Sequence, residues 1–189
     1  MINISINKFK KVLKSLAMLD AIIMPEWEYR YFSFDSQWGE YEEMASMKTG
    51  HGEEYYILFK GDSVIGKYYY PSYNHQIDLK DIPPCFNEFM NEVAFKMDDI
   101  SNIFYRVSNN EEWVYLPNEF KCKYLFFDAN EYKNWAEEYY ETNLDIRSIE
   151  HIFSSQSIND EIVMNLNPDI VINDIVDDII EINYPVVKE

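Results

Sequence analysis

Residues 55–70 read YYILFKGDSVIGKYYY, and this stretch decides the fold class. The runs at 55–59 and 64–70 are apolar and aromatic, with a period close to two, as in β-strands. The turn Lys60-Gly61-Asp62-Ser63 between them offers a glycine for positive φ, which tight hairpin turns need. We therefore predict two antiparallel strands here. The first is apolar on both faces and is expected to lie centrally in a sheet.

The same pattern extends in both directions along the chain. Residues 29–34 and 44–47 are predicted as earlier strands, and Thr49-Gly50-His51-Gly52 supplies a second glycine-containing turn. Downstream, residues 102–107 and 113–116 are predicted to pair, and residues 123–127 are a candidate for one more strand. The whole pattern predicts an antiparallel β-meander of about four to six strands.

Helical patterns flank this meander. Residues 3–23 place apolar side chains at three- and four-residue intervals and stop at Pro25, and Pro83-Pro84 opens a short inserted helix. Three N-terminal capping signals predict helices in the last third of the chain: Asp128 with Glu131, Ser157 with Asp160, and Asn167 with Pro168. The final helix is expected to end by Tyr184-Pro185.

The predicted fold class is therefore α+β, in a single domain. It has an N-terminal helix at 1–24, a mainly antiparallel sheet with one inserted helix at 28–127, and a helical segment at 128–185. A length of 189 residues suits one well-buried core. The 47% hydrophobic content allows enough apolar burial to offset the chain's conformational entropy.

Charge narrows the range of partners. Sixteen basic and 34 acidic residues leave a net charge of −18, which repels nucleic acid and anionic lipid and favours a basic protein. Acidity that only maintains solubility is the alternative. The segment from Ser148 to Val187 has no lysine or arginine and is either a solvated helix face or a partner-binding face.

The sequence predicts a cytoplasmic protein. Cys85 and Cys122 lie far apart without a metal-binding spacing, which suits a reducing compartment, and Cys85 is expected to be buried. The lysine-rich N-terminus imitates a secretory signal, but Lys14 and Asp20 interrupt its apolar part. No run is long enough to cross a bilayer.

Catalytic motifs are missing from the sequence. It contains no nucleophile elbow, no phosphate-binding glycine loop and no histidine pair at metal-ligand spacing, so we expect neither cofactor nor metal. One enzymatic alternative remains, a hydrolase that uses His51 with Glu53, Glu54 or Asp35 as acid and base. A passive interaction module is the third alternative.

Acidic residues occur together with aromatic residues, and this combination is typical of a surface that binds a basic protein. About half of the tyrosines between 29 and 73 are expected to face outward. The predicted partner-binding residues are Asp35, Trp38, Glu40, Tyr41, Glu42, Glu43, His51, Glu53 and Glu54.

Two resemblances bear on function. Residues 27–38 and 44–59, with Trp135 to Tyr140 and Asn183-Tyr184-Pro185, resemble an uncharacterised family of small bacterial proteins that look like immunity proteins of toxin systems. Residues 82–90 are similar to one segment of the SMI1/KNR4 superfamily, which also includes immunity proteins. These resemblances imply a non-catalytic protein that neutralises a basic toxin domain.

Overall fold

The computed structural model describes residues 4–72, 77–108, 111–117, 122–154 and 156–187. The chain divides into two compact units. Unit 1 comprises Met1–Phe9 and Gln37–Cys122, and unit 2 comprises Lys10–Ser36 and Lys123–Glu189. The predicted single domain stays a prediction.

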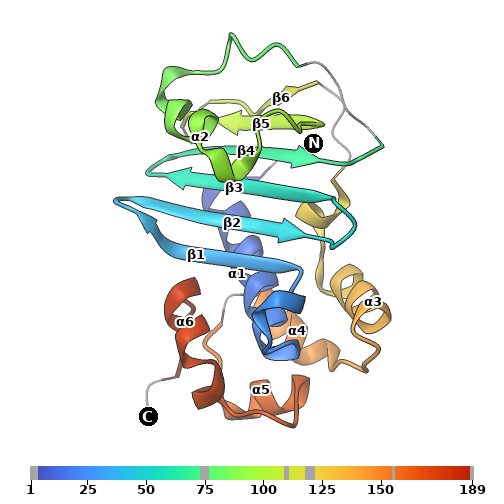
Figure 1. Cartoon of the computed structure of the whole chain (residues 1–189). Coiled ribbons are helices and arrows are strands. Elements are labelled where there is room, and N and C mark those ends of the chain that lie inside the picture. The colour runs from blue at the N-terminus through green and yellow to red at the C-terminus, as the bar shows by residue number, and fades with distance from the viewer. Residues whose placement is uncertain (1–3, 73–76, 109–110, 118–121, 155, 188–189) are drawn as a thin grey trace. The chain divides into compact units, whose positions relative to one another are not determined.

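The sheet is a six-stranded antiparallel meander in which each strand lies beside the next one in the chain (Figure 1). Its strands are β1 (Phe32–Gly39), β2 (Glu42–Lys48), β3 (Glu54–Lys60), β4 (Ser63–Tyr69), β5 (Asn102–Arg106) and β6 (Val114–Leu116). Strand β3 pairs with β2 on one side and β4 on the other, and its first six residues are buried. The predicted α+β class, the meander and the central position of residues 55–59 are confirmed.

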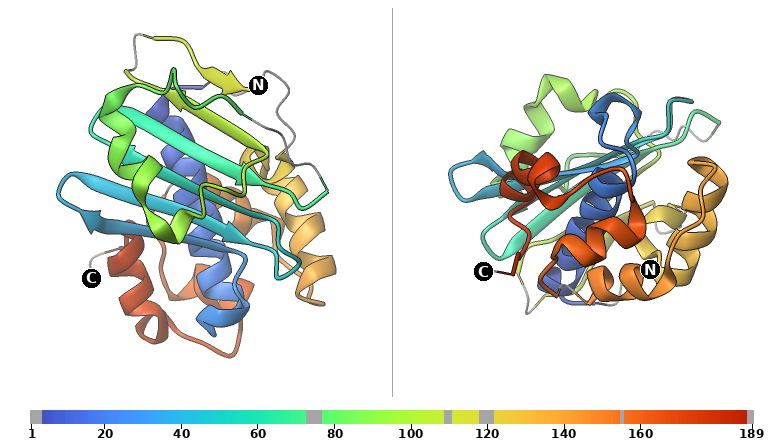
Figure 2. Two further views of the ribbon diagram at one scale, coloured as in Figure 1. Left: turned by 45° about the horizontal axis from the view of Figure 1, so that its top comes forward. Right: turned by 90° about the horizontal axis from the view of Figure 1, so that it is seen from below.

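In unit 1, a short helical segment covers one face of the sheet, as the green ribbon in the left panel of Figure 2 shows. Its parts are η2 (Pro84–Phe86), α2 (Asn87–Asn91) and η3 (Val93–Phe95). Their buried phenylalanines pack with Tyr56 and Leu58, which lie on one side of β3 because side chains alternate along a strand. Phe59, on the opposite side, packs against Phe9 with ring centroids 6.0 Å apart.

Unit 2 contains most of the N-terminal helix and the remaining helices of the chain. These are α1 (Ile6–Ile23), η1 (Trp27–Tyr29), η4 (Lys123–Phe126), α3 (Ala129–Tyr139), α4 (Ile146–Phe153), α5 (Asp160–Leu166), η5 (Ile172–Ile175) and α6 (Val176–Ile182). In Figures 1 and 2, α4 lies beside α1, where the Ser15 hydroxyl donates to the Ile152 carbonyl at 2.9 Å. The predicted helical C-terminal third is confirmed.

A fully buried carboxylate, Asp20, organises unit 2. Its Oδ2 accepts hydrogen bonds from the backbone N–H groups of Tyr31 (2.9 Å) and Phe32 (2.8 Å), and its Oδ1 accepts one from the Tyr132 hydroxyl (2.7 Å). Burial raises the pKa of Asp20 to about 6, while these hydrogen bonds act in the opposite direction. The carboxylate thus joins α1, the start of β1 and α3.

Several local predictions were wrong. Residues 123–126 form a 3-10 turn instead of a strand. The cap of α5 is Asn159, whose side chain accepts from the Ile162 N–H, so the Ser157–Asp160 signal was misplaced. The Asn167 side chain accepts from the Asp169 N–H in a turn that starts no helix directly. An Asn or Asp side chain can accept from a nearby backbone N–H in a turn as readily as at the start of a helix. The local sequence pattern is therefore ambiguous.

Other local predictions agree with the structure. The capping box of Asp128 and Glu131 is present at α3. Asn183 ends α6 in the left-handed region, with φ 53°, directly before Tyr184. Cys85, by contrast, is exposed, because Phe86 and Phe89 are the residues of this segment that turn into the core. Among the helices that the structure describes, none has the length and apolar character needed to cross a bilayer.

Candidate partner-binding pocket

An acidic and aromatic pocket lies in unit 1, between the β1–β2 turn, β3 and the helical segment formed by α2 and η3. Its volume is about 360 Å³. Its lining residues are Trp38, Glu40, Glu42, Leu58, Lys60, Glu88, Phe89, Glu92 and Phe95. Four carboxylates and one ammonium leave the lining with a net charge of three negative.

Strand register places the charges of this pocket. Glu42 on β2 lies directly opposite Lys60 on β3, and opposite charges in this position attract. The Lys60 Nζ lies 2.8 Å from Glu42 Oε1 and also donates to Glu88, on α2. The hydrogen bonds that Lys60 donates to Glu42 and then to Glu88 raise the pKa of Lys60, and the bond from Lys60 lowers the pKa of Glu88. The pocket therefore already holds one ammonium group between two carboxylates.

One wall of the pocket is a stack of aromatic rings. The indole of Trp38 stacks on Phe95, with centroids 6.1 Å apart and an interplanar angle of 28°. Phe95 in turn stacks on Tyr56 at 4.9 Å and contacts Phe89 at 4.8 Å. Trp38 is 44% exposed, whereas Phe95 is buried. A ring that meets solvent is thus supported from behind by rings of the core.

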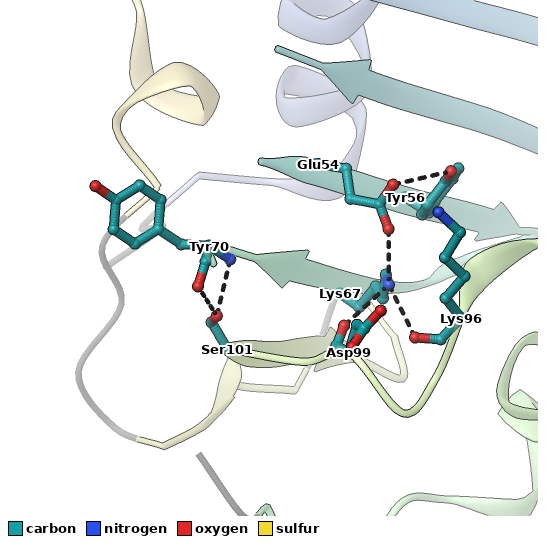
Figure 3. Close-up of polar contacts among 7 residues, drawn as sticks. All are labelled: Glu54, Tyr56, Lys67, Tyr70, Lys96, Asp99 and Ser101. Carbon is teal, nitrogen blue, oxygen red and sulfur yellow. Dashed lines mark hydrogen bonds and ion pairs between the residues drawn. The ribbon is translucent and has the colours of Figure 1, made fainter. Parts of the chain in front are cut away.

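A buried lysine holds the loop that follows Phe95. Lys67 on β4 has a fully buried side chain, and its Nζ donates to Glu54 Oε1 at 3.1 Å (Figure 3). The same nitrogen donates to the backbone carbonyls of Lys96 (3.2 Å) and Asp99 (3.0 Å). Because these carbonyls lie just after Phe95 in the chain, Lys67 fixes the position of the aromatic wall.

The groups around Lys67 stabilise its positive charge against the effect of burial. Burial lowers the pKa of its ammonium, and the negative charge of Glu54 acts in the opposite direction. The Lys67 Nζ also lies 5.5 Å from the ring centroid of Tyr56, within the range of a cation–π contact. Nearby, the Ser101 hydroxyl accepts from the Tyr70 N–H at 2.8 Å and donates to the Tyr70 carbonyl at 3.2 Å (Figure 3). The 96–101 segment is thus attached at one end to Lys67 on β4 and at the other to Tyr70, the residue after β4.

Three of the predicted partner-binding residues come together in the pocket: Trp38, Glu40 and Glu42. Tyr41 lies between them in the β1–β2 turn and is 83% exposed. Glu43 is half-buried and follows Glu42, so alternation places it on the other face of β2. Asp35 is half-buried and belongs to unit 2.

The other three predicted residues lie at the opposite end of β2, about 20 Å away for a strand of seven residues. His51 is exposed in the β2–β3 turn, where its Nδ1 lies 3.1 Å from the Thr49 carbonyl oxygen. Glu53 accepts from the Tyr68 hydroxyl, and Glu54 pairs with Lys67. These contacts direct the two carboxylates away from acid–base chemistry at His51, so the geometry does not favour the hydrolase alternative.

The tyrosines predicted to form an outward row are distributed differently. Tyr55, Tyr56 and Tyr68 are buried in unit 1, and Tyr31 is buried in unit 2. Between residues 27 and 72, the exposed aromatic residues are Trp27 and Tyr29 in η1, and Trp38, Tyr41 and Tyr70 at the β1–β2 turn and at strand ends. Tyr73 and His75 lie outside the described residues. Strands β3 and β4 are buried on both faces, which leaves no surface on these two strands for such a row.

Sequence reasoning missed the remaining lining residues of the pocket, above all Lys60, Glu88 and Glu92. Pairing the residues of the two strands outward from the β2–β3 turn places Lys60 opposite Glu42. This pair could therefore have been predicted from the sequence. The two glutamates lie four residues apart after the predicted Pro83-Pro84 start, which puts them on one helical side. Which strand that side approaches is decided only by the packing of α2.

Among the residues that the structure describes, no three His, Cys, Asp or Glu side chains are arranged to hold a metal ion. The four carboxylates of the pocket are therefore not arranged as a metal-binding set, and two of them, Glu42 and Glu88, meet at the ammonium of Lys60. Comparisons of this chain with protein-family models, with curated proteins and with solved structures found no match.

Proposed function

We propose that this chain is a non-catalytic, immunity-type protein that neutralises a basic toxin domain by binding it, in the bacterial cytoplasm. The acidic and aromatic pocket of unit 1 is the centre of the proposed contact. The observation that carries the proposal is the combination, in one pocket, of four carboxylates with an exposed indole.

Residues adjacent to the pocket lining in the chain support a protein partner. Tyr41, next to Glu40 and Glu42, is 83% exposed, and Val93, next to Glu92, is 89% exposed. Exposed tyrosine and tryptophan side chains are typical anchors of protein interfaces, the exposed valine adds apolar surface beside them, and surrounding charged groups give specificity. A basic partner would be steered by the net charge of −18 and retained by contacts with the aromatic groups.

The proposal is tested by co-expression with the toxin domain encoded by a neighbouring gene. The wild-type chain is expected to restore growth and to form a complex with the toxin domain at low salt that weakens as salt is raised. Reversing two exposed charges of the pocket, Glu40→Lys with Glu88→Lys, is expected to weaken the complex at least about tenfold.

A matched control reverses two exposed carboxylates of unit 2, Glu138→Lys with Glu150→Lys, which changes the net charge by the same amount. This control is expected to retain the growth rescue. Failure of the wild-type chain to rescue growth or to form a complex at low salt would contradict the proposed function. Equal losses in both double variants would show that overall charge, and not the pocket, carries the binding.

A further inference from the structure

We infer that the pocket of unit 1 receives one arginine side chain of the basic partner, whose guanidinium lies over Trp38 and pairs with Glu40. This inference rests on the proposed function and names the group that the pocket recognises. A volume of about 360 Å³ lies near the lower end of the roughly 300–1,000 Å³ range of ligand pockets, so one side chain suits it better than a folded element.

The charges of the pocket leave one carboxylate for a ligand. Lys60 already lies between Glu42 and Glu88, so these two carboxylates have a cation of their own. Glu40 is exposed and makes no hydrogen bond or ion pair with any residue that the structure describes. Glu92 uses Oε1 to accept from the Ala94 N–H at 3.0 Å and adds a further negative charge. A second cation is thus favoured at the Glu40 side of the pocket.

The shape of the lining favours a planar cation. A guanidinium can stack on an aromatic face and bind a carboxylate through two parallel hydrogen bonds, whereas an ammonium is a compact, strongly hydrated charge. Trp38 provides such a ring, since the residue is 44% exposed and lines the pocket. A divalent metal fits less well, because the carboxylates in the described part of the chain do not converge as a metal-binding set.

The aromatic wall is held in place before any ligand arrives. Phe95 stacks on Trp38, and Lys67 donates to the carbonyls of Lys96, directly after Phe95, and of Asp99, three residues further on. A preorganised wall lowers the entropic cost of ordering side chains on binding. The pocket can therefore accept an arginine without rearrangement of its backbone.

The test uses the full chain and three short peptides, acetyl-Ser-Gly-Arg-Gly-Ser-amide and its analogues with lysine or citrulline in place of arginine. Binding at low salt is followed by NMR through the indole N–H signal of Trp38. The arginine peptide is expected to bind at a millimolar dissociation constant, the lysine peptide about fivefold more weakly, and the uncharged citrulline peptide not measurably.

Variants locate the binding. Trp38→Leu and Glu40→Gln, followed through other shifted amides of unit 1, are each expected to weaken the arginine peptide about fivefold or more, and Trp38→Phe less. Trp27→Leu, which removes an exposed indole of unit 2, is the matched control and is expected to change nothing. Unchanged backbone amide spectra elsewhere in unit 1 show that each variant is folded.

The outcomes separate this inference from the proposed function. Absence of arginine-peptide binding, equal binding of the lysine peptide, or an unchanged affinity in Trp38→Leu would overturn the arginine inference even if the chain still rescues growth. Arginine binding at Trp38 without growth rescue would leave the inference standing and contradict the immunity role.

Discussion

The two units each bury an ionised side chain, and they stabilise it in different ways. In unit 1, the ammonium of Lys67 faces the carboxylate of Glu54 and two backbone carbonyls. In unit 2, the carboxylate of Asp20 faces two backbone N–H groups and a tyrosine hydroxyl, and it forms no ion pair with any residue that the structure describes. The buried charge of unit 1 is thus stabilised mainly by an opposite charge, whereas the buried charge of unit 2 is stabilised by the dipoles of N–H and O–H groups.

This difference has consequences for stability. When one member of a buried ion pair is removed by mutation, the other charge stays buried without a partner. The loss of unfolding free energy is therefore large. A charge solvated only by dipoles is costly to keep ionised, which is why burial raises the pKa of Asp20 to about 6. Unit 1 is therefore expected to be sensitive to removal of its buried charge, and unit 2 to pH.

The largest expected effect comes from Lys67→Met. The substitution leaves the carboxylate of Glu54, whose side chain is only 11% exposed, without its cation, and is expected to cost about 3–5 kcal/mol of unfolding free energy. Urea denaturation, with hydrogen exchange of β3 and β4 amides, measures it. Adding Glu54→Gln should recover part of the loss, because the uncompensated charge is then gone. A cost near zero for Lys67→Met alone would mean that this pair does not hold unit 1 together.

The pH dependence of unit 2 is the next largest effect. The folded-state pKa of Asp20, about 6, lies above its ordinary value of 3.8, so the stabilisation from this group is present below about pH 4 and is lost as pH rises through 6. A shift of this size corresponds to about 3 kcal/mol. We expect the wild type to lose that amount relative to Asp20→Asn between pH 3.5 and pH 7.5, as measured by urea denaturation at each pH.

Comparison with Asp20→Asn removes the contributions of carboxylates common to both chains. A hydrogen bond from the Leu144 N–H is the main cause that lowers the pKa of Glu137, and hydrogen bonds from Ser148 lower the pKa of Asp145. Carboxylates with a lowered pKa make the folded state more stable as pH rises, which is opposite to the effect of Asp20. A difference between the two chains that does not vary with pH would show that the Asp20 carboxyl has an ordinary pKa in the folded state.

A smaller effect is expected from Arg30→Lys, which tests a charge pair in unit 2. The guanidinium of Arg30 binds both oxygens of Asp178 and donates to the carbonyls of Met24 (2.7 Å) and Pro25 (2.6 Å). A lysine cannot reproduce this fork, and we expect a loss of about 1–2 kcal/mol in urea denaturation. Arg147→Lys, at an exposed position of α4, is the matched control, with an expected change within about 0.5 kcal/mol. Equal effects of the two substitutions would place Arg30 among ordinary surface residues.

Much of the fold follows from local pattern. The period-two runs with glycine turns predicted the strands and an antiparallel meander, since consecutive strands joined by short turns pair with each other. The place of β5 beside β4 did not follow in this way, because residues 70–101 separate the two strands. The Asp128–Glu131 capping box was also readable, because its two reciprocal hydrogen bonds lie within four residues. The errors at 123–127, Ser157 and Asn167 occurred where a short segment suits more than one local structure.

The candidate site was only partly predictable. Trp38, Glu40 and Glu42 are close in the chain, so their clustering required no tertiary information. His51, Glu53 and Glu54 belonged to the same predicted set, yet the length of β2 separates them from the pocket. Charged residues that are close in the chain can lie at opposite ends of a strand. Which end each one occupies is known only once the first and last residues of the strand are known.

By itself the sequence determined the class of the fold, the antiparallel meander, the net charge and the supply of acidic and aromatic side chains, and it left the order of all six strands open. These properties depend on residue type and on spacing within a few positions of the chain. Only the tertiary structure decided that Glu88, Glu92 and Phe95 approach Lys60 and Trp38, and that Lys67 and Asp20 are the buried charges. Such contacts join segments tens of residues apart, and they arise because apolar faces pack together and each buried charge must find its partners in the fold.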